Sequence, residues 1–214
     1  MARPPMTDAQ RAAAVERRRS AVLVGLATSI NAKGYAATTI ADIASAGGVS
    51  KSAVYDHFHD KEAVFLALYA AATGRVIEVV RERQAEARAA GLPWEQQVGV
   101  TLRAYLQAME AGKDLTRCLL VEAPAVSPAA RRLRRSAIDD YGAVLLGIAA
   151  EIAEGDPELS VPDATLVPLV IGGLQELILQ ALEQDDPWDL DAMTALGAAL
   201  LISSARGRLD APPA

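Results

Sequence analysis

The sequence predicts an all-α fold, and three observations support this prediction. Residues that favour helices, chiefly Ala, Leu, Glu and Arg, are abundant, whereas only 4% of the 214 residues are aromatic. Apolar residues recur at helical intervals, as at Val22, Leu26 and Ile30. Glycine and proline divide the chain into segments of helical length. With 51% hydrophobic residues, the chain can bury a largely aliphatic core.

The uneven distribution of charge indicates two domains. Residues 1–60 contain seven Lys or Arg and five Asp or Glu, a balance of +2, and because the whole chain carries −6, the remainder carries −8. A mildly positive head on an acidic body suits a head that binds a polyanion. We expect one domain at 1–60, with a tail at 1–8, and a second, helical domain at 61–214.

Cysteine usage and hydropathy exclude several classes of protein. Cys118 is the only cysteine, so an internal disulfide and a paired-cysteine metal site are excluded, and we expect its thiol to be buried. No uninterrupted apolar stretch reaches the roughly 18 residues of a membrane span, and the N-terminus lacks the apolar core of a signal peptide. We therefore expect a cytoplasmic protein without a membrane partner.

The first helix is expected to begin after Thr7 and to run to about Lys33. Thr7 and Gln10 have the spacing of a capping box. Gly34 follows at the position where glycine commonly ends a helix. The three arginines at 17–19 point to different sides of this helix, so solvated surface and DNA backbone contact both stay open for them.

Two short helices joined by a glycine turn follow. Thr39 and Asp42 repeat the capping spacing, and a helix of about two turns then ends at Gly47. Ser50 caps the next helix, whose inner side carries Val54 and Phe58. Its outer face and tip carry small and polar residues, namely Lys51, Ser52, Ala53 and Asp56. A helix-turn-helix unit places such residues against base edges in the major groove of DNA.

The two histidines suggest metal binding or catalysis as alternatives. His57 and His59 are two residues apart, so on a helix they would point to different faces and could not chelate one ion. A catalytic histidine needs a nucleophile and an orienting acid in a water-excluding pocket, which a two-turn helix does not provide. We expect no metal site, no cofactor and no enzymatic activity.

The segment TTIADIASAGGVSKSAVYDHFHDKEAVFLALY resembles the DNA-binding signature of the TetR family of transcriptional regulators, and the resemblance covers about residues 20–70. It implies a three-helix helix-turn-helix domain followed by a helical ligand-binding and dimerisation domain. It also implies phosphate contacts from Thr39, Tyr55, His57 and Lys61, and base contacts from Lys51 and Ser52, beside the cap Ser50. Two positions depart from the family's pattern: Ala53 offers only a methyl contact, and Asp56 can either accept from cytosine or point away along the helix.

The rest of the chain is expected to contain six helices. Asp60 caps a long helix that runs to about Ala90, and glycine and proline divide the remainder into about five more. Pro168 requires that the helix containing it either kinks or begins late. The last two apolar segments are expected to form a four-helix interface in a two-fold dimer, with Gly172, Gly173, Leu177, Gly197, Leu200 and Leu201. A monomer core is the alternative.

The resemblance implies a ligand chamber among the middle helices. Candidates for its wall are Tyr105, Met109, Cys118, Tyr141, Leu145 and Gln175, each of which could instead belong to plain core. We therefore expect a homodimer that binds a palindromic operator in double-stranded DNA and is released by a small molecule. The alternative is a helical ligand-binding or protein-interaction module without operator-specific binding.

Overall fold

The computed structural model describes residues 7–156, 158–184 and 187–207, and within these ranges every regular element is a helix. The head contains α1 (Asp8–Ala37), α2 (Ile40–Ala46) and α3 (Lys51–Tyr55), and α4 (Lys61–Ala89) leads into the body. The body continues with α5 (Trp94–Ala111), α6 (Lys113–Arg117), the π-helix η1 (Cys118–Glu122), α7 (Ala123–Val126), α8 (Pro128–Ala153), α9 (Leu166–Gln184) and α10 (Leu190–Ala205). The all-α prediction is confirmed.

Four helix starts follow from local side chains, as predicted. The hydroxyls of Thr7 and Thr39 cap α1 and α2, each within a reciprocal capping box. Ser50 accepts a hydrogen bond from the backbone of Ala53 at the start of α3, and Asp60 caps α4 in the same way. These caps fix the four points at which the chain turns to build the head.

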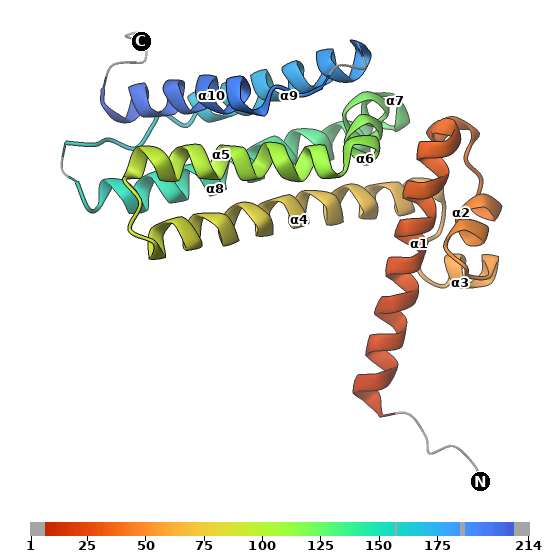
Figure 1. Ribbon diagram of the computed structural model, residues 1–214. Helices are drawn as coiled ribbons and strands as arrows, with labels where there is room; N and C mark the ends of the chain where they lie inside the picture. Colours follow the sequence, from red (N-terminus) through yellow and green to blue (C-terminus); the bar gives the residue numbers. More distant parts are fainter. Residues whose placement is uncertain (1–6, 157, 185–186, 208–214) are drawn as a thin grey trace.

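The first helix is longer than predicted but breaks where predicted. Helical structure extends to Ala37, but Gly34 has φ 78° and ψ 163°, which interrupts the helical backbone. Only glycine adopts this left-handed φ without steric cost. The result is a kink at the head-to-body end of α1, and the far end of the helix protrudes past α3 (Figure 1).

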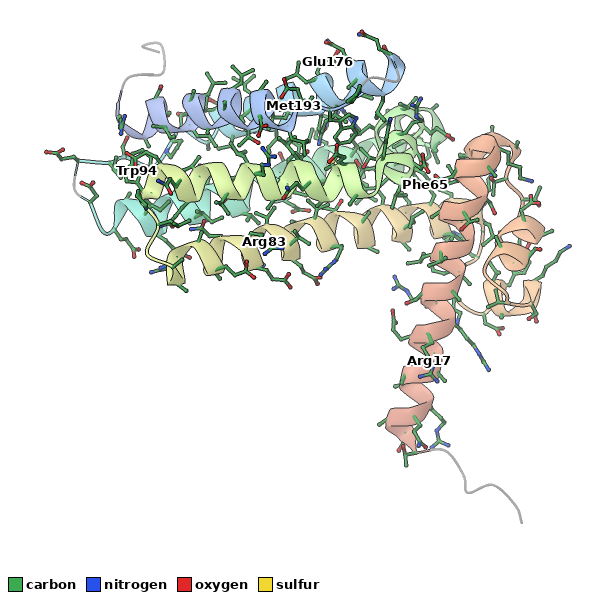
Figure 2. All side chains as sticks on the ribbon, viewed as in Figure 1. Arg17, Phe65, Arg83, Trp94, Glu176 and Met193 are labelled. Atoms are coloured by element: carbon green, nitrogen blue, oxygen red, sulfur yellow. The ribbon has the colours of Figure 1, made fainter. Side chains whose placement is uncertain are left out.

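The body is a bundle in which α4, α5 and α8 run lengthwise, and α9 and α10 lie along one side of it (Figure 1). Its core is aliphatic, and fully buried side chains include Leu102, Leu106, Ile171 and Ile178. The head occupies one end of this bundle, where α1 contacts α4, α6 and η1. Figure 2 shows Phe65 at that end and Trp94 at the opposite end.

The middle of the chain contains more elements than the five helices predicted. Gly112 does separate α5 from α6, but the chain stays helical through the expected break at residues 123–124. It changes direction instead at Ser127, whose backbone is extended and whose side chain caps α8. Pro168 is the third residue of α9, so that helix begins late instead of kinking.

Two helices of the body, α4 and α9, have the length and apolar composition of a membrane span. Both pack into the bundle, however, α4 against α5 and α8, and α9 against α8 and α10. Buried apolar residues of a helical core explain this composition equally well.

Candidate nucleic-acid interface and ligand cavity

The head is built on a close crossing of α1 and α2 at two glycines. A Cβ atom placed on Gly25 would collide with the carbonyl oxygen of Ile43 and lie 2.8 Å from the backbone nitrogen of Gly47. A Cβ atom placed on Gly47 would lie 2.5 Å from the carbonyl oxygen of Ala21. Because backbone meets backbone here, only glycine permits this approach. The crossing fixes the angle at which α2 and α3 stand on α1.

The outer face of α3 carries the residues that were predicted to meet DNA. Lys51 and Ser52 are exposed, and the Ser52 hydroxyl lies 2.9 Å from that of Ser50. Tyr55 is 57% exposed, which is unusual for an aromatic side chain that binds no polar partner. Val54 is fully buried against the head's core, so the helix presents one face to solvent. The exposed face forms a polar surface whose only cation is Lys51.

The hydroxyl of Thr39 is already engaged with Asp42. It donates to the Asp42 carboxylate at 2.6 Å, and the Lys33 ammonium lies 2.7 Å from the same carboxylate. Hydrogen bonds from Lys33 and Thr39 hold the pKa of Asp42 well below its usual range. The side chain of Thr39 therefore serves first as a helix cap, and a phosphate would have to replace Asp42 as its acceptor.

The two histidines differ in their surroundings. His57 is half-buried beside the buried ring of Phe58, which lies beyond the end of α3 and still faces the core, as predicted. His59 is exposed, 3.2 Å from the Asp60 carboxylate. Among the described residues, no three His, Cys, Asp or Glu side chains come together as a metal site.

Lys61 lies differently from what the resemblance implies. Its ammonium group points back into the head, where it donates to the carbonyl oxygens of Tyr35 at 2.8 Å and Thr38 at 2.9 Å. It also lies 4.1 Å from the centre of the Tyr35 ring. Burial lowers the pKa of Lys61 from its usual value. The structure thus favours an anchoring role over the expected phosphate contact.

The arginines of α1 belong to its protruding part. Arg17 and Arg18 are exposed, and Figure 2 shows Arg17 on the segment that extends past α3. Arg19 is half-buried, with its guanidinium 5.9 Å from the centre of the Phe58 ring. Two of the three arginines are thus directed to solvent at the end where the head is most exposed.

A cavity of about 220 Å³, hereafter called the main cavity because predicted wall residues line it, lies between α4, α5, α6, η1, α8 and α9. A larger space of about 580 Å³ lies between α4 and α8. Three predicted wall residues line the main cavity, Met109, Tyr141 and Gln175. Tyr105 and Leu145 instead line a neighbouring space of about 10 Å³, which also borders Tyr141. Cys118 is buried but lines none of the described cavities, and burial raises the pKa of its thiol to about 12.

Gln175 supplies the main buried polar group of this cavity. The side chain is 3% exposed, and its amide nitrogen donates to the Tyr105 hydroxyl at 3.2 Å. Its amide oxygen is buried without a hydrogen-bond partner. A buried acceptor without a partner is costly, so a ligand that donates to it gains affinity. Burial also raises the pKa values of Tyr105 and Tyr141, so both phenols are neutral at physiological pH.

The predicted dimer residues lie on two different faces of α9 and α10. Gly197 is packed inside the chain, 3.1 Å from Leu102 at the position of its missing Cβ, and Leu201 is 7% exposed. For these two residues the prediction is wrong, because they face the chain's own core. Gly173 has open space around it, Leu200 is 38% exposed, and Gly172 and Leu177 are half-buried.

The outer face of the two helices carries apolar residues that the sequence reasoning missed. Leu169 on α9 is 70% exposed and Leu196 on α10 is 55% exposed. Gly25 in the head and the cavity residues Tyr69, Thr73 and Thr116 were not predicted from the sequence either. A polar residue at helical spacing from apolar ones, as Thr73 is from Tyr69 and Val76, could have indicated a cavity wall.

Comparisons with known proteins agree with this architecture. Residues 23–68 match the family model described as bacterial regulatory proteins, tetR family. The fatty acid degradation regulator FadR from Bacillus halodurans superposes with a TM-score of 0.73 at 21% identity, covering 88% of this chain and 96% of that chain. FadR from Bacillus subtilis, solved with stearoyl-CoA, gives 0.71 at 20% identity, covering 86% and 98%. No curated protein sequence matches.

Proposed function

We propose that the chain is a ligand-controlled transcriptional repressor, because residues 23–68 match the family model of bacterial regulatory proteins, tetR family. Two copies would bind a palindromic operator, and a small molecule in the body would release them. The observation that supports this most directly is the pairing of an exposed, polar α3 at one end with a cavity of about 220 Å³ in the attached body. We propose a cytoplasmic location and no enzymatic role.

The proposed dimer joins the outer faces of α9 and α10. Leu169, Leu196 and Leu200 expose apolar surface there, and an apolar patch of this kind marks an interaction site. A two-fold axis through these helices would present two α3 helices to one side of the DNA. Half-sites about 34–36 Å apart, or a multiple of that distance, would then fit both heads.

We propose an apolar ligand with one neutral polar group. Two smaller spaces lie beside the main cavity along α5. Tyr141 borders the first and second spaces, and Leu145 borders the second and third. The third space, of about 40 Å³, ends at Trp94. From Met109 to Trp94, α5 rises by about 22 Å at 1.5 Å per residue, so the three spaces together have the length of an extended chain. Stearoyl-CoA, with which the Bacillus subtilis neighbour was solved, has a long apolar acyl chain and is a suitable first probe of these spaces, although its coenzyme A part is charged and would lie outside them.

The proposal is tested by fluorescence anisotropy on the DNA that flanks the gene, at two salt concentrations and with random duplex as competitor. We expect salt-dependent binding that random DNA does not displace. Addition of a ligand that fills the cavity should then weaken this binding. Equal affinity for random DNA would instead favour a helical ligand-binding or protein-interaction module.

Lys51→Ala is expected to relax base preference, because Lys51 is the cation on the exposed face of α3. Loss of a specific base contact should cost about 1–3 kcal/mol on the operator and much less on random DNA. The measurement compares dissociation constants for the two duplexes. Equal losses on both would contradict a base-reading role.

Lys61→Ala is the variant to compare with Lys51→Ala. Since the Lys61 ammonium already binds two backbone carbonyls, we expect a lower thermal stability of the head and little change in the salt dependence of DNA binding. If Lys61 instead contacts a phosphate, the magnitude of the slope of log affinity against log salt concentration should be about one unit smaller for the variant than for the unmodified protein.

Gln175→Leu is expected to weaken a ligand whose polar group binds the free amide oxygen, by about 1–3 kcal/mol. The fold should tolerate the change, because the variant removes an unpaired buried acceptor together with one hydrogen bond to Tyr105. Calorimetric titration with stearoyl-CoA, and with a simple long-chain alcohol, measures the loss. Unchanged affinity for both compounds would place the polar group of the ligand elsewhere.

A further inference from the structure

Glu122, the last residue of η1, joins the body to the kink in α1. Its carboxylate accepts a hydrogen bond from the backbone N–H of Tyr35 at 2.5 Å, across 87 positions of sequence. The same carboxylate lies 3.6 Å from the position that a Cβ atom of Gly34 would occupy. Gly34 therefore gives the carboxylate access to an N–H that an unbroken helix would bond internally. This hydrogen bond is charge-assisted, which makes it strong.

The kinked segment is held from its other side by Lys61. The Lys61 ammonium donates to the carbonyl oxygen of Tyr35, so one residue has its N–H bound by the body and its C=O bound by α4. The Tyr35 ring also packs edge-on against Phe65 of α4, at 5.1 Å between ring centres. Removing Glu122 would free the N–H side of this segment and remove a nearby negative charge from Lys61, while the hydrogen bonds of Lys61 to the carbonyl oxygens would keep their acceptors.

The helix that carries Glu122 is also a wall of the main cavity. Leu119 and Leu120 of η1 line the cavity and are 8% and 5% exposed. Leu119 is three positions before Glu122 in the same helix. A π-helix is a rare, locally distorted turn that occurs preferentially at functional sites. Any ligand that pushes η1 outward must therefore move the Glu122 carboxylate relative to Tyr35.

We propose that the contact between Glu122 and Tyr35, hereafter the α1 latch, transmits ligand binding to the DNA-binding head. This assignment rests on the proposed function. A ligand in the main cavity displaces η1, withdraws the carboxylate from the Tyr35 N–H and frees the end of α1 from the body. The head then changes its angle to the body. Glu122 is a positioning residue in this scheme, and it acts at α1 instead of through α4.

The latch can be tested without a known ligand, because a large side chain can fill the cavity. Ala72 of α4 lines the cavity, whereas Ala71 beside it is exposed. Ala72→Trp in the whole 214-residue chain represents the state with a filled cavity, and Ala71→Trp is its matched control. If Ala72→Trp does not fold, Ala108→Phe fills the same cavity from α5. Circular dichroism verifies the fold of each variant.

Amide hydrogen exchange of Tyr35, followed by NMR on protein labelled with ¹⁵N-tyrosine, reports the latch directly. We expect Glu122→Ala to accelerate Tyr35 exchange at least tenfold while the amide of Tyr69, buried within α4, keeps its rate. Glu122→Gln, which keeps an acceptor oxygen, should show a smaller acceleration. An unchanged Tyr35 rate in Glu122→Ala would overturn the proposal.

The double variant Ala72→Trp/Glu122→Ala tests whether the signal from the cavity reaches the head through the α1 latch. Ala72→Trp alone should accelerate Tyr35 exchange and weaken DNA binding at least fivefold, whereas adding it to Glu122→Ala should change neither quantity further. A full effect of Ala72→Trp in the Glu122→Ala background would place the coupling in α4 and overturn the latch. The exchange measurement uses no DNA, so the exchange rates alone confirm or refute the latch. If the protein fails to bind an operator, the proposed function is refuted but the latch is not decided by that result.

Discussion

Gly25→Ala is expected to unfold the DNA-binding head or displace α2 from α1. The added methyl group would meet the carbonyl oxygen of Ile43 and the backbone nitrogen of Gly47, and neither can rotate away as a side chain could. Overpacking of this kind costs about 3 kcal/mol, or more where backbone must move. Urea unfolding followed by circular dichroism should show a less stable head, and operator binding should be lost.

Gly74→Ala is the control for this prediction. Gly74 lies in the middle of α4, and a Cβ atom placed on it meets nothing within 4 Å. Here alanine should stabilise the protein by about 0.5–1 kcal/mol, because it restricts the unfolded chain and favours the helix. If both variants changed stability by the same amount, the close crossing at Gly25 would not explain the result.

Leu196→Glu is expected to produce a monomer that no longer binds a palindromic operator tightly. Leu196 is 55% exposed on α10 and belongs to the outer apolar face that we propose as the dimer interface. A buried carboxylate at that interface would be strongly unfavourable. Without the second head, operator affinity should fall by about 10²-fold or more, because the avidity of two linked sites is lost. Light scattering after gel filtration measures the mass.

Val15→Glu is the matched control for the dimer prediction. Val15 is 51% exposed in the first half of α1. The free end of that helix lies far from α9 and α10 (Figure 1). The same substitution there should leave the molecular mass unchanged. A dimer that survives Leu196→Glu would place the interface on another face of the body.

The parts of the fold that depend on neighbours in sequence could be predicted. Each cap of the head uses residues three positions apart, so Thr7, Thr39, Ser50 and Asp60 could be identified without coordinates. The helix-turn-helix followed from these caps and from the glycine turn. The close crossing at Gly25 could not be found in this way, because it depends on how two helices meet.

Contacts between distant segments explain the errors in the candidate sites. The last two helices are apolar on most sides, so no polar face indicated that Gly197 and Leu201 turn inward while Leu169 and Leu196 turn outward. Lys61 was expected at DNA because its sequence position fits the family, but the kink at Gly34 brings the carbonyl of Tyr35 to its ammonium. Glu122 gave no local signal, since its partner is 87 residues away.

Because α4 is a single, uninterrupted helix, a small change in the angle between the head and the body is converted into a large displacement of the head. The 29 residues of α4 span about 43 Å at 1.5 Å per residue, and the head sits at one end of that length (Figure 1). A tilt of about 5° around the far end would move the head by roughly 4 Å, which is close to the 3.4 Å step between base pairs. Once the α1 latch is open, a change of this size in the angle of the head would therefore shift α3 by about one base pair along an operator.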